Sequence, residues 1–276
     1  MKLILDSGSN LRKEEIPENA AVVPLFICTD EKEFKDDENL DVQAMVKYLE
    51  NAKCPSHSAC PGIDDFAREL EGEKDAIIIT LAARLSGCYN SAYTAAGLYI
   101  EENADSTVYV IDSNAIGPTE RLLFEKFKEC EEKGLGVDET YDVLTDYSYN
   151  HLKIGFCLKS LTNLANNGRI SPVIAKFTSV VGIQIVGTFT DWGELQPTHK
   201  ARGEKKACEA MLSDMLEAGY KGGKVRIDHC DGLDKALLFK KILEEKFPGC
   251  DVSIGETTGL CSFYAERGGI VFSFEK

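Results

Sequence analysis

Three short, uninterrupted apolar runs in the first half of the chain restrict its fold more than any other feature. The runs are Leu3–Leu5, Ala76–Thr80 and Val108–Asp112. A strand with one face in water alternates apolar and polar residues, whereas a strand covered on both faces reads as a continuous apolar run, as in parallel sheets. We therefore predict that each run is a strand of a buried parallel sheet.

Helical patterns separate these predicted strands, so strand and helix alternate along the chain. Such alternation is typical of an α/β domain with helices on both faces of its sheet. We predict a doubly wound domain over residues 1–152. Its expected helices are Asp41–Asn51, Asp64–Glu71, Ser86–Glu102 and Thr119–Lys133.

The pattern changes after about residue 152, where strands outnumber helices. We predict a mixed α+β domain over residues 153–276, and a chain of 276 residues is long enough for two domains. Asp191-Trp192-Gly193 is typical of a turn between strands. The expected helices are Lys205–Glu217 and Leu233–Lys246, and the expected strands are Ile154–Cys157, Val180–Val186, Val225–Ile227, Val252–Ile254 and Ile270–Phe274.

A formal net charge of −15 excludes several partners. An acidic chain is repelled by phosphate backbones and by anionic membrane surfaces. We therefore expect neither nucleic-acid binding nor stable membrane insertion, and no apolar stretch approaches the ~20 residues of a membrane span. The first residues form too short an apolar run for a signal peptide, which leads us to expect a cytoplasmic protein.

Ten cysteines are present, but none forms a C-x-x-C pair or lies at zinc-finger spacing from a histidine. The adjacent pair His229-Cys230 is isolated. We predict free thiols in a reducing compartment and neither a metal nor a cofactor.

The segment after the second predicted strand is the most informative one. Ser86 and Gly87 stand where a helix is expected to begin after a buried parallel strand. Free N–H groups and the helix dipole at such a position favour an anion. Taken alone, Ser86 is more simply explained as a helix cap.

Two further segments offer polar groups. The segment Cys54–Gly62 contains two prolines and a glycine, so we expect a loop without regular structure that presents Ser58 and His57. The alternative is a rigid connector. Arg169 follows the turn Asn166-Asn167-Gly168 and suits a carboxylate, although a surface arginine is the simpler explanation. The acidic stretch Asp30–Asp41 is expected to be a solvated loop.

Aspartates at predicted strand ends suggest a different class of function. Asp6 or Asp112 could serve a small-molecule phosphotransferase or hydrolase, because an aspartate after a first strand can be a phosphoryl acceptor. Haloacid-dehalogenase-like enzymes place a second aspartate two residues on, where this chain has Gly8. Nor does Ser86 lie in a Gly-x-Ser-x-Gly elbow.

Taken in order, several segments resemble the motifs of the DegV family along essentially the whole chain. They are Ile4-Leu5-Asp6-Ser7, Ser58-Ala59-Cys60-Pro61, Leu85-Ser86-Gly87-Cys88-Tyr89, Val110-Ile111-Asp112-Ser113, Asn167-Gly168-Arg169-Ile170-Ser171, Asp191-Trp192-Gly193-Glu194 and the basic stretch from Lys200 to Lys206. The resemblance implies two α/β domains with one long-chain fatty acid, such as palmitate or oleate, buried between them.

The same resemblance implies a carrier and not an enzyme, which presents the acid to a separate fatty acid kinase for acyl-phosphate formation and phospholipid synthesis. It assigns the carboxylate to Ser58, Ser86 with Gly87, and Arg169. Tyr264 stands where the family carries a histidine, Cys88 where it carries a threonine, and Ala82-Ala83 where it carries two serines. A tyrosine can donate one hydrogen bond but does not become a cation.

Overall fold

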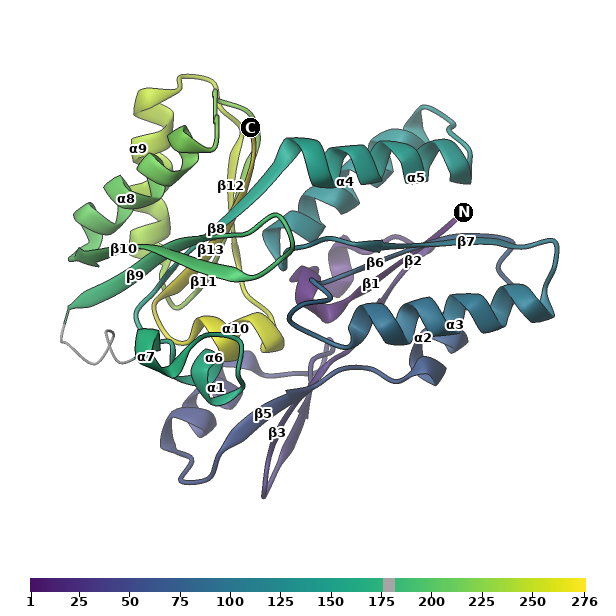
Figure 1. Cartoon of the computed structure of the whole chain (residues 1–276), viewed down its shortest axis with the longest axis horizontal. Helices are drawn as coiled ribbons and strands as arrows, with labels where there is room; N and C mark the ends of the chain where they lie inside the picture. The colour runs from purple at the N-terminus through teal and green to yellow at the C-terminus, as the bar shows by residue number, and fades with distance from the viewer. Residues whose placement is uncertain (176–181) are drawn as a thin grey trace.

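The computed structural model describes residues 1–175 and 182–276. Two sheets stand side by side, and a small third sheet projects below them (Figure 1). We refer to them as the parallel sheet, the mixed sheet and the small sheet. The predicted α/β architecture, with a parallel sheet in the first half and a mixed sheet in the second, is confirmed.

The parallel sheet has the order β2-β1-β6-β7, and all its neighbours are parallel. Figure 1 shows α4 and α5 on one face and α2 and α3 on the other. Leu3 and Ile77 pack toward α4 and α5, whereas Ile4 and Ile78 pack toward α2 and α3. Both faces are therefore apolar, which explains the continuous runs. The bounds are β1 (Lys2–Asp6), β2 (Ala20–Val23), β6 (Asp75–Thr80), β7 (Thr107–Asp112), α2 (Ile63–Leu70), α3 (Cys88–Glu102), α4 (Pro118–Glu132) and α5 (Val137–Asp146).

The mixed sheet has the order β10-β9-β8-β13-β11-β12, and only β11 and β12 pair in parallel among these described strands. Two helices, α8 and α9, cover one face through Phe239, Phe272 and their neighbours. The other face turns toward the parallel sheet. The bounds are β8 (Leu152–Leu158), β9 (Ile183–Phe189), β10 (Leu195–Arg202), β11 (Val225–Cys230), β12 (Val252–Glu256), β13 (Gly269–Glu275), α8 (Glu204–Glu217) and α9 (Leu233–Lys246).

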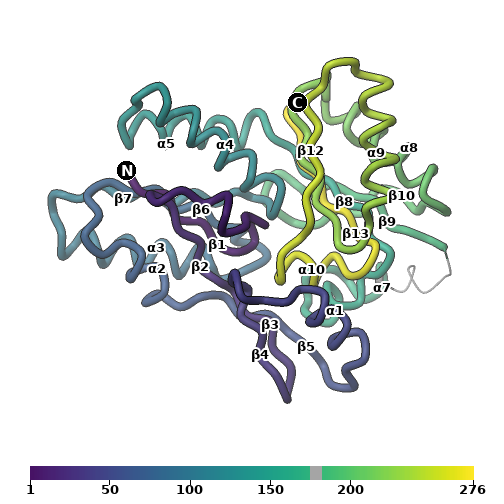
Figure 2. The backbone as a smooth tube through the Cα atoms, turned by 180° about the vertical axis from the view of Figure 1, so that it is seen from behind, coloured from purple at the N-terminus to yellow at the C-terminus, as the bar shows by residue number. Residues whose placement is uncertain are grey.

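The small sheet corrects two predictions. Cys54–Gly62 is not a loop throughout, because β5 (Ser56–Ala59) pairs with β3 (Phe26–Thr29). The stretch Asp30–Asp41 is not simply solvated, since it contains β4 (Glu33–Lys35) and the buried Asp36. Seen from behind, this sheet lies beside α1 (Val42–Asn51) (Figure 2). Short polar strands of this kind carry almost no local signal.

Further differences concern the second half of the chain. The strand expected at Val180–Val186 is β9, which ends three residues later, while residues 180 and 181 lie outside the described residues. The turn at Asp191-Trp192-Gly193 joins β9 to β10, as predicted, but β10 itself was missed, as were β2 and α5. The remaining short elements are α6 (Thr162–Asn166), α7 (Pro172–Ala175), α10 (Gly259–Ala265), two 3-10 turns, Ser7–Ser9 and Lys13–Glu15, and a π-helical turn, Tyr147–His151.

Helix α4 ties the two large sheets together. The Arg226 guanidinium of β11 donates to both carboxylate oxygens of Glu125, at 2.6 and 2.8 Å. Nearer the start of α4, the hydroxyls of Thr119 and Ser273 lie 2.5 Å apart. These contacts hold the carboxyl ends of the parallel strands against the inner face of the mixed sheet. A division into domains at residues 152 and 153 remains a proposal.

Candidate functional site

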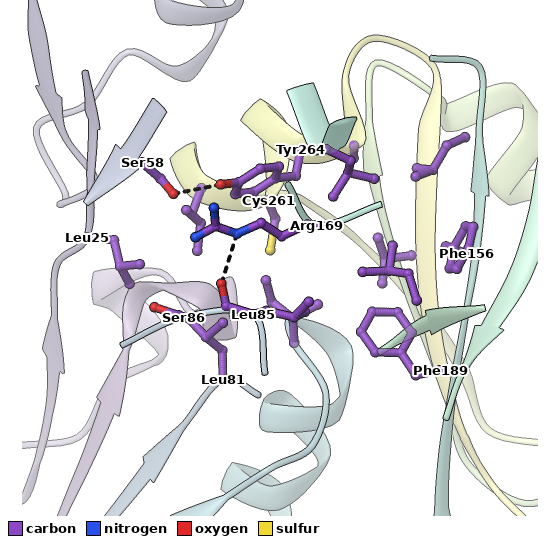
Figure 3. Close-up of a pocket in the computed structure, with 17 residues that line it drawn as sticks. Leu25, Ser58, Leu81, Leu85, Ser86, Phe156, Arg169, Phe189, Cys261 and Tyr264 are labelled. Carbon is purple, nitrogen blue, oxygen red and sulfur yellow. Dashed lines mark hydrogen bonds between the residues drawn. The ribbon is translucent and has the colours of Figure 1, made fainter. Parts of the chain in front are cut away.

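A cavity of about 60 Å³ lies between the carboxyl ends of the parallel strands and the inner face of the mixed sheet (Figure 3). In open α/β sheets this edge is where ligands bind. Leu25, Leu81 and Ile116 come from loops of the parallel sheet, and Phe156 and Val271 come from the mixed sheet. Four polar residues interrupt a wall that is otherwise apolar apart from Cys261: Ser58, Ser86, Arg169 and Tyr264.

These four residues are sequence-predicted site residues, and the fold brings them to one cavity from four separate elements. Ser58 is on β5 and Tyr264 on α10, and their hydroxyl oxygens lie 2.7 Å apart. Ser86 precedes α3, and Arg169 follows α6. Gly87, the fifth predicted residue, is not among the lining residues of this cavity.

Arg169 is aimed at the cavity by the end of α6. Gly168 has a φ of +72°, a left-handed conformation that glycine adopts without strain. The next amide, that of Arg169, donates to the carbonyl of Leu164 at 2.8 Å. The Arg169 guanidinium then donates from Nε to the carbonyl of Leu85 at 3.0 Å and from Nη1 to the carbonyl of Asn167. The carbonyls hold the side chain in place without neutralising its charge.

Ser86 differs from its predicted role as the N-cap of α3. The helix begins at Cys88, and Gly87 occupies the N-cap position. The hydroxyl oxygen of Ser86 still accepts the N–H of Cys88 at 3.2 Å, and the hydroxyl lies 3.2 Å from the Cys88 sulfur. Gly87 has an ordinary φ of −77°, so its role is space: a Cβ there would lie 3.0 Å from the sulfur of Cys60. Gly87 therefore lets the loop after β5 approach the loop of Ser86.

Two carboxylates, those of the buried Asp6 and the half-buried Asp112, hold the loop that carries Ser86. Asp6 accepts the N–H groups of Leu81 and Gly8, each at 2.8 Å. Asp112 accepts the N–H of Ala83 at 3.2 Å and that of Asn114 at 2.9 Å. Because backbone donors occupy both side chains, they shape the loop that carries Ser86. This arrangement gives no support to a phosphoryl acceptor at Asp6 or Asp112.

Tyr264 reaches the cavity on α10, a helix held at its start by Asp36. The amides of Gly259 and Leu260 donate to the two Asp36 carboxylate oxygens at 2.6 and 2.8 Å. Burial raises the pKa of Tyr264, while its bond to Ser58 and the charge of Arg169 act in the opposite direction. The phenol is therefore neutral at physiological pH and can donate one hydrogen bond.

Sequence reasoning missed the apolar wall and the supporting carboxylate. Cys261 lines the cavity, and burial raises its pKa well above the usual value, so it stays a thiol. Asp36 was assigned to a solvated stretch but is only 4% exposed. A single charged residue inside an acidic run gives no local sign of burial. One signal was available: the first amides of α10 need a hydrogen-bond acceptor, and that need points to a nearby partner such as a carboxylate.

Neither a metal cluster nor a membrane span is found in the described part of the chain. Within residues 1–175 and 182–276, no group of three or more His, Cys, Asp or Glu side chains could hold a metal ion. No helix in the same residues is long and apolar enough to cross a membrane. All ten cysteines are free thiols.

Comparison with known sequences decides the family. A profile described as the DegV family of uncharacterised proteins matches residues 1–276. The chain is a member of the DegV family. A DegV domain-containing protein of Streptococcus pneumoniae is 35% identical over 277 aligned residues, which cover 99% of this chain and 98% of that protein.

Two solved structures resemble this DegV protein closely. A DegV family protein from Eubacterium eligens loaded with heptadecanoic acid has a TM-score of 0.96 and 37% identity, covering 100% of this chain and 99% of that one. The fatty acid kinase B3 protein of Streptococcus pneumoniae, loaded with linoleic acid, has a TM-score of 0.95 and 35% identity, covering 99% and 98%. Both relatives thus hold a long-chain fatty acid.

Proposed function

We propose that this DegV protein is a cytoplasmic carrier that binds one long-chain fatty acid, such as palmitate or oleate, between domains 1–152 and 153–276. The observation that carries the proposal is the convergence of four polar side chains in a cavity whose other walls are apolar, apart from one thiol. A carboxylate needs a few donors at one end, and an acyl chain contributes about 0.8 kcal/mol per buried CH₂ at the other. The fatty acids in two relatives support the same ligand class.

Each polar residue has a distinct part in this proposal. Arg169 supplies the charge, Ser86 and Tyr264 supply hydroxyl donors, and Ser58 orients the Tyr264 hydroxyl through their 2.7 Å contact. Gly87 keeps the loop of Ser86 close to Cys60. A tyrosine in the histidine position leaves Arg169 as the one cation among the residues lining the described cavity. No histidine lining the described cavity then gains or loses a charge beside the carboxylate.

The direct test is native mass spectrometry of the purified protein, followed by denaturation and lipid identification. A mass increment of one fatty acid is expected, and the released lipid names the preferred chain. A protein that carries no lipid and also refuses added palmitate and oleate would contradict the proposal.

Ser86→Ala is expected to weaken fatty acid binding by roughly 1–3 kcal/mol, because one buried carboxylate oxygen loses its donor. Titration with a fluorescent fatty acid measures the change. Ser91→Ala is the matched control, since Ser91 lies within the first turn of α3 and is not among the cavity's lining residues. Equal affinities for the two variants would remove Ser86 from the site.

Arg169→Ala is expected to weaken binding about 10- to 100-fold, since hydrogen bonds to a charged group contribute about 1.5–3 kcal/mol. The control is Arg84→Ala, because Arg84 is an exposed arginine of the same region that pairs with Glu194. Melting temperatures separate lost binding from lost folding. A folded Arg169→Ala protein with the affinity of Arg84→Ala would show that the carboxylate lies elsewhere.

The carrier is further proposed to present the bound carboxylate to a separate fatty acid kinase. In that reaction a carboxylate oxygen attacks the γ-phosphorus of ATP, and acyl phosphate and ADP form. Support comes from the name of one relative, the fatty acid kinase B3 protein. The test combines the loaded carrier, a fatty acid kinase catalytic subunit and Mg-ATP. ADP release that requires the loaded carrier is expected, and equal release with free fatty acid alone would contradict this role.

A further inference from the structure

Phe189 separates the cavity of the candidate site from a second one. The second cavity has a volume of about 80 Å³ and lies beyond the end of β9, where Ala115, Leu152 and Ile154 form its apolar part. Among the described residues, Phe189 alone lines both cavities. Its ring packs against two hydrophobic clusters, one around Phe156 and one formed by Ala115, Ile154 and Val271.

The partition stands at the far end of the first cavity from the polar residues. Figure 3 shows Phe189 and Phe156 away from Ser58 and Tyr264, on the side of the mixed sheet. An acyl chain whose carboxylate meets the polar residues therefore runs toward Phe189. A cavity of about 60 Å³ is small beside the ~300–1,000 Å³ typical of ligand pockets. A long chain needs additional space in this direction.

The two phenylalanines at this end differ in their freedom to move. The Phe156 ring is fully buried in the middle of β8 and lies over Gly187, where a Cβ would come within 2.4 Å of its Cζ. Phe189 is the last residue of β9, is only half-buried, and meets Phe156 edge-on at 6.1 Å between ring centroids. Rotation of Phe189 about its Cα–Cβ bond therefore displaces far less packing than rotation of Phe156.

We infer that Phe189 determines how long an acyl chain the site accepts: with the ring turned aside, the two cavities join and the end of the chain lies against Ala115, Leu152 and Ile154. Polar residues complete the second cavity and limit how many further CH₂ groups gain from burial there: the buried Ser113, Thr119 and Ser148, and Lys153 and Asp191 at its rim. The inference rests on the proposed fatty acid function and adds a specificity-determining residue to it.

The test is a competition titration with saturated fatty acids graded from dodecanoic to eicosanoic acid. Each CH₂ that becomes buried raises affinity roughly fourfold. Phe189→Ala is expected to raise the ratio of eicosanoic to dodecanoic acid affinity at least about tenfold over the wild-type ratio, because the partition is removed. Phe189→Trp is expected to lower that ratio, because a larger ring closes the passage.

Leu195→Ala is the matched control. Leu195 pairs with Phe189 across β9 and β10 and lines only the first cavity. Its replacement is expected to change the affinities of all the acids by a similar factor. Phe189→Leu replaces Phe189→Ala if the latter does not fold, as judged by its melting temperature.

Two failures are distinguishable. If the wild-type protein binds the acids but Phe189→Ala and Phe189→Trp both keep its ratio, the inference about Phe189 is wrong and the proposed function stands. If the wild-type protein binds none of the acids, the proposed function is wrong, and the inference falls with it.

Discussion

Asp36→Ala is expected to lower the free energy of unfolding by roughly 2–6 kcal/mol. Asp36 accepts two short hydrogen bonds from the amides of Gly259 and Leu260. Truncation leaves both amides buried without an acceptor, and each such loss costs about 1–3 kcal/mol. Urea unfolding, followed by the far-ultraviolet signal, measures the effect.

The same substitution is expected to weaken fatty acid binding, because α10 carries Tyr264. Hydrogen exchange of residues 257–265 should accelerate more than exchange in the parallel sheet, since the helix loses its anchor. The lower stability and the faster exchange would both result from the loss of the Asp36 acceptor at the start of α10.

The neighbouring residue provides the control for this prediction. Asp37→Ala removes a carboxylate that pairs with the exposed Lys35 and caps a local turn through the amide of Asn39. Such surface interactions contribute about 1 kcal/mol or less. Equal losses for Asp36→Ala and Asp37→Ala would mean that the anchor of α10 contributes little.

Stability is expected to decline as the pH rises from about 4 to about 7. Burial is the main cause that raises the pKa of Asp6 to about 7 and the pKa values of Asp36 and Asp228 to about 6. For Asp6, burial outweighs the hydrogen bonds from Leu81 and Gly8. An aspartate in the unfolded chain has a pKa of about 3.9.

Raised carboxyl pKa values in the folded chain make stability fall as the pH rises. A carboxyl group whose folded pKa is raised contributes its stability in full below the unfolded pKa, and this contribution is lost as the pH rises through the folded pKa. For Asp6 the loss is roughly 4 kcal/mol over that range, at about 1.4 kcal/mol per pKa unit. Glu129 acts oppositely: bonds to Lys126 and Lys224 lower its pKa to about 2, so its contribution is lost in acid.

Urea unfolding at a series of pH values tests this dependence, and Asp6→Asn is the comparison. The variant lacks the titrating group, so we expect a lower but flatter stability profile across the same pH range. Superimposable slopes for the wild-type protein and Asp6→Asn would show that Asp6 titrates alike in the folded and unfolded chains.

Local sequence determined the elements whose signal lies within a few residues of one another. The runs at Leu3–Leu5 and Ala76–Thr80 became β1 and β6, because a strand buried on both faces needs apolar side chains at every position. The turn at Asp191-Trp192-Gly193 also follows from local chemistry. Ser86 and Arg169, both of which line the cavity, were singled out because glycines and strand ends mark the places where backbone turns can present polar side chains.

Tertiary structure alone decided which distant residues meet. Ser58 and Tyr264 are 206 positions apart in the chain yet share a hydrogen bond, and Asp36 became buried only because α10 begins beside it. The strand β5 forms because β3 supplies a partner for its backbone, not because Ser56–Ala59 favours a strand. The cavity wall and the position of Phe189 between two cavities arise in the same way. Burial and partnership are properties of the whole packing arrangement, so no short stretch of sequence encodes them.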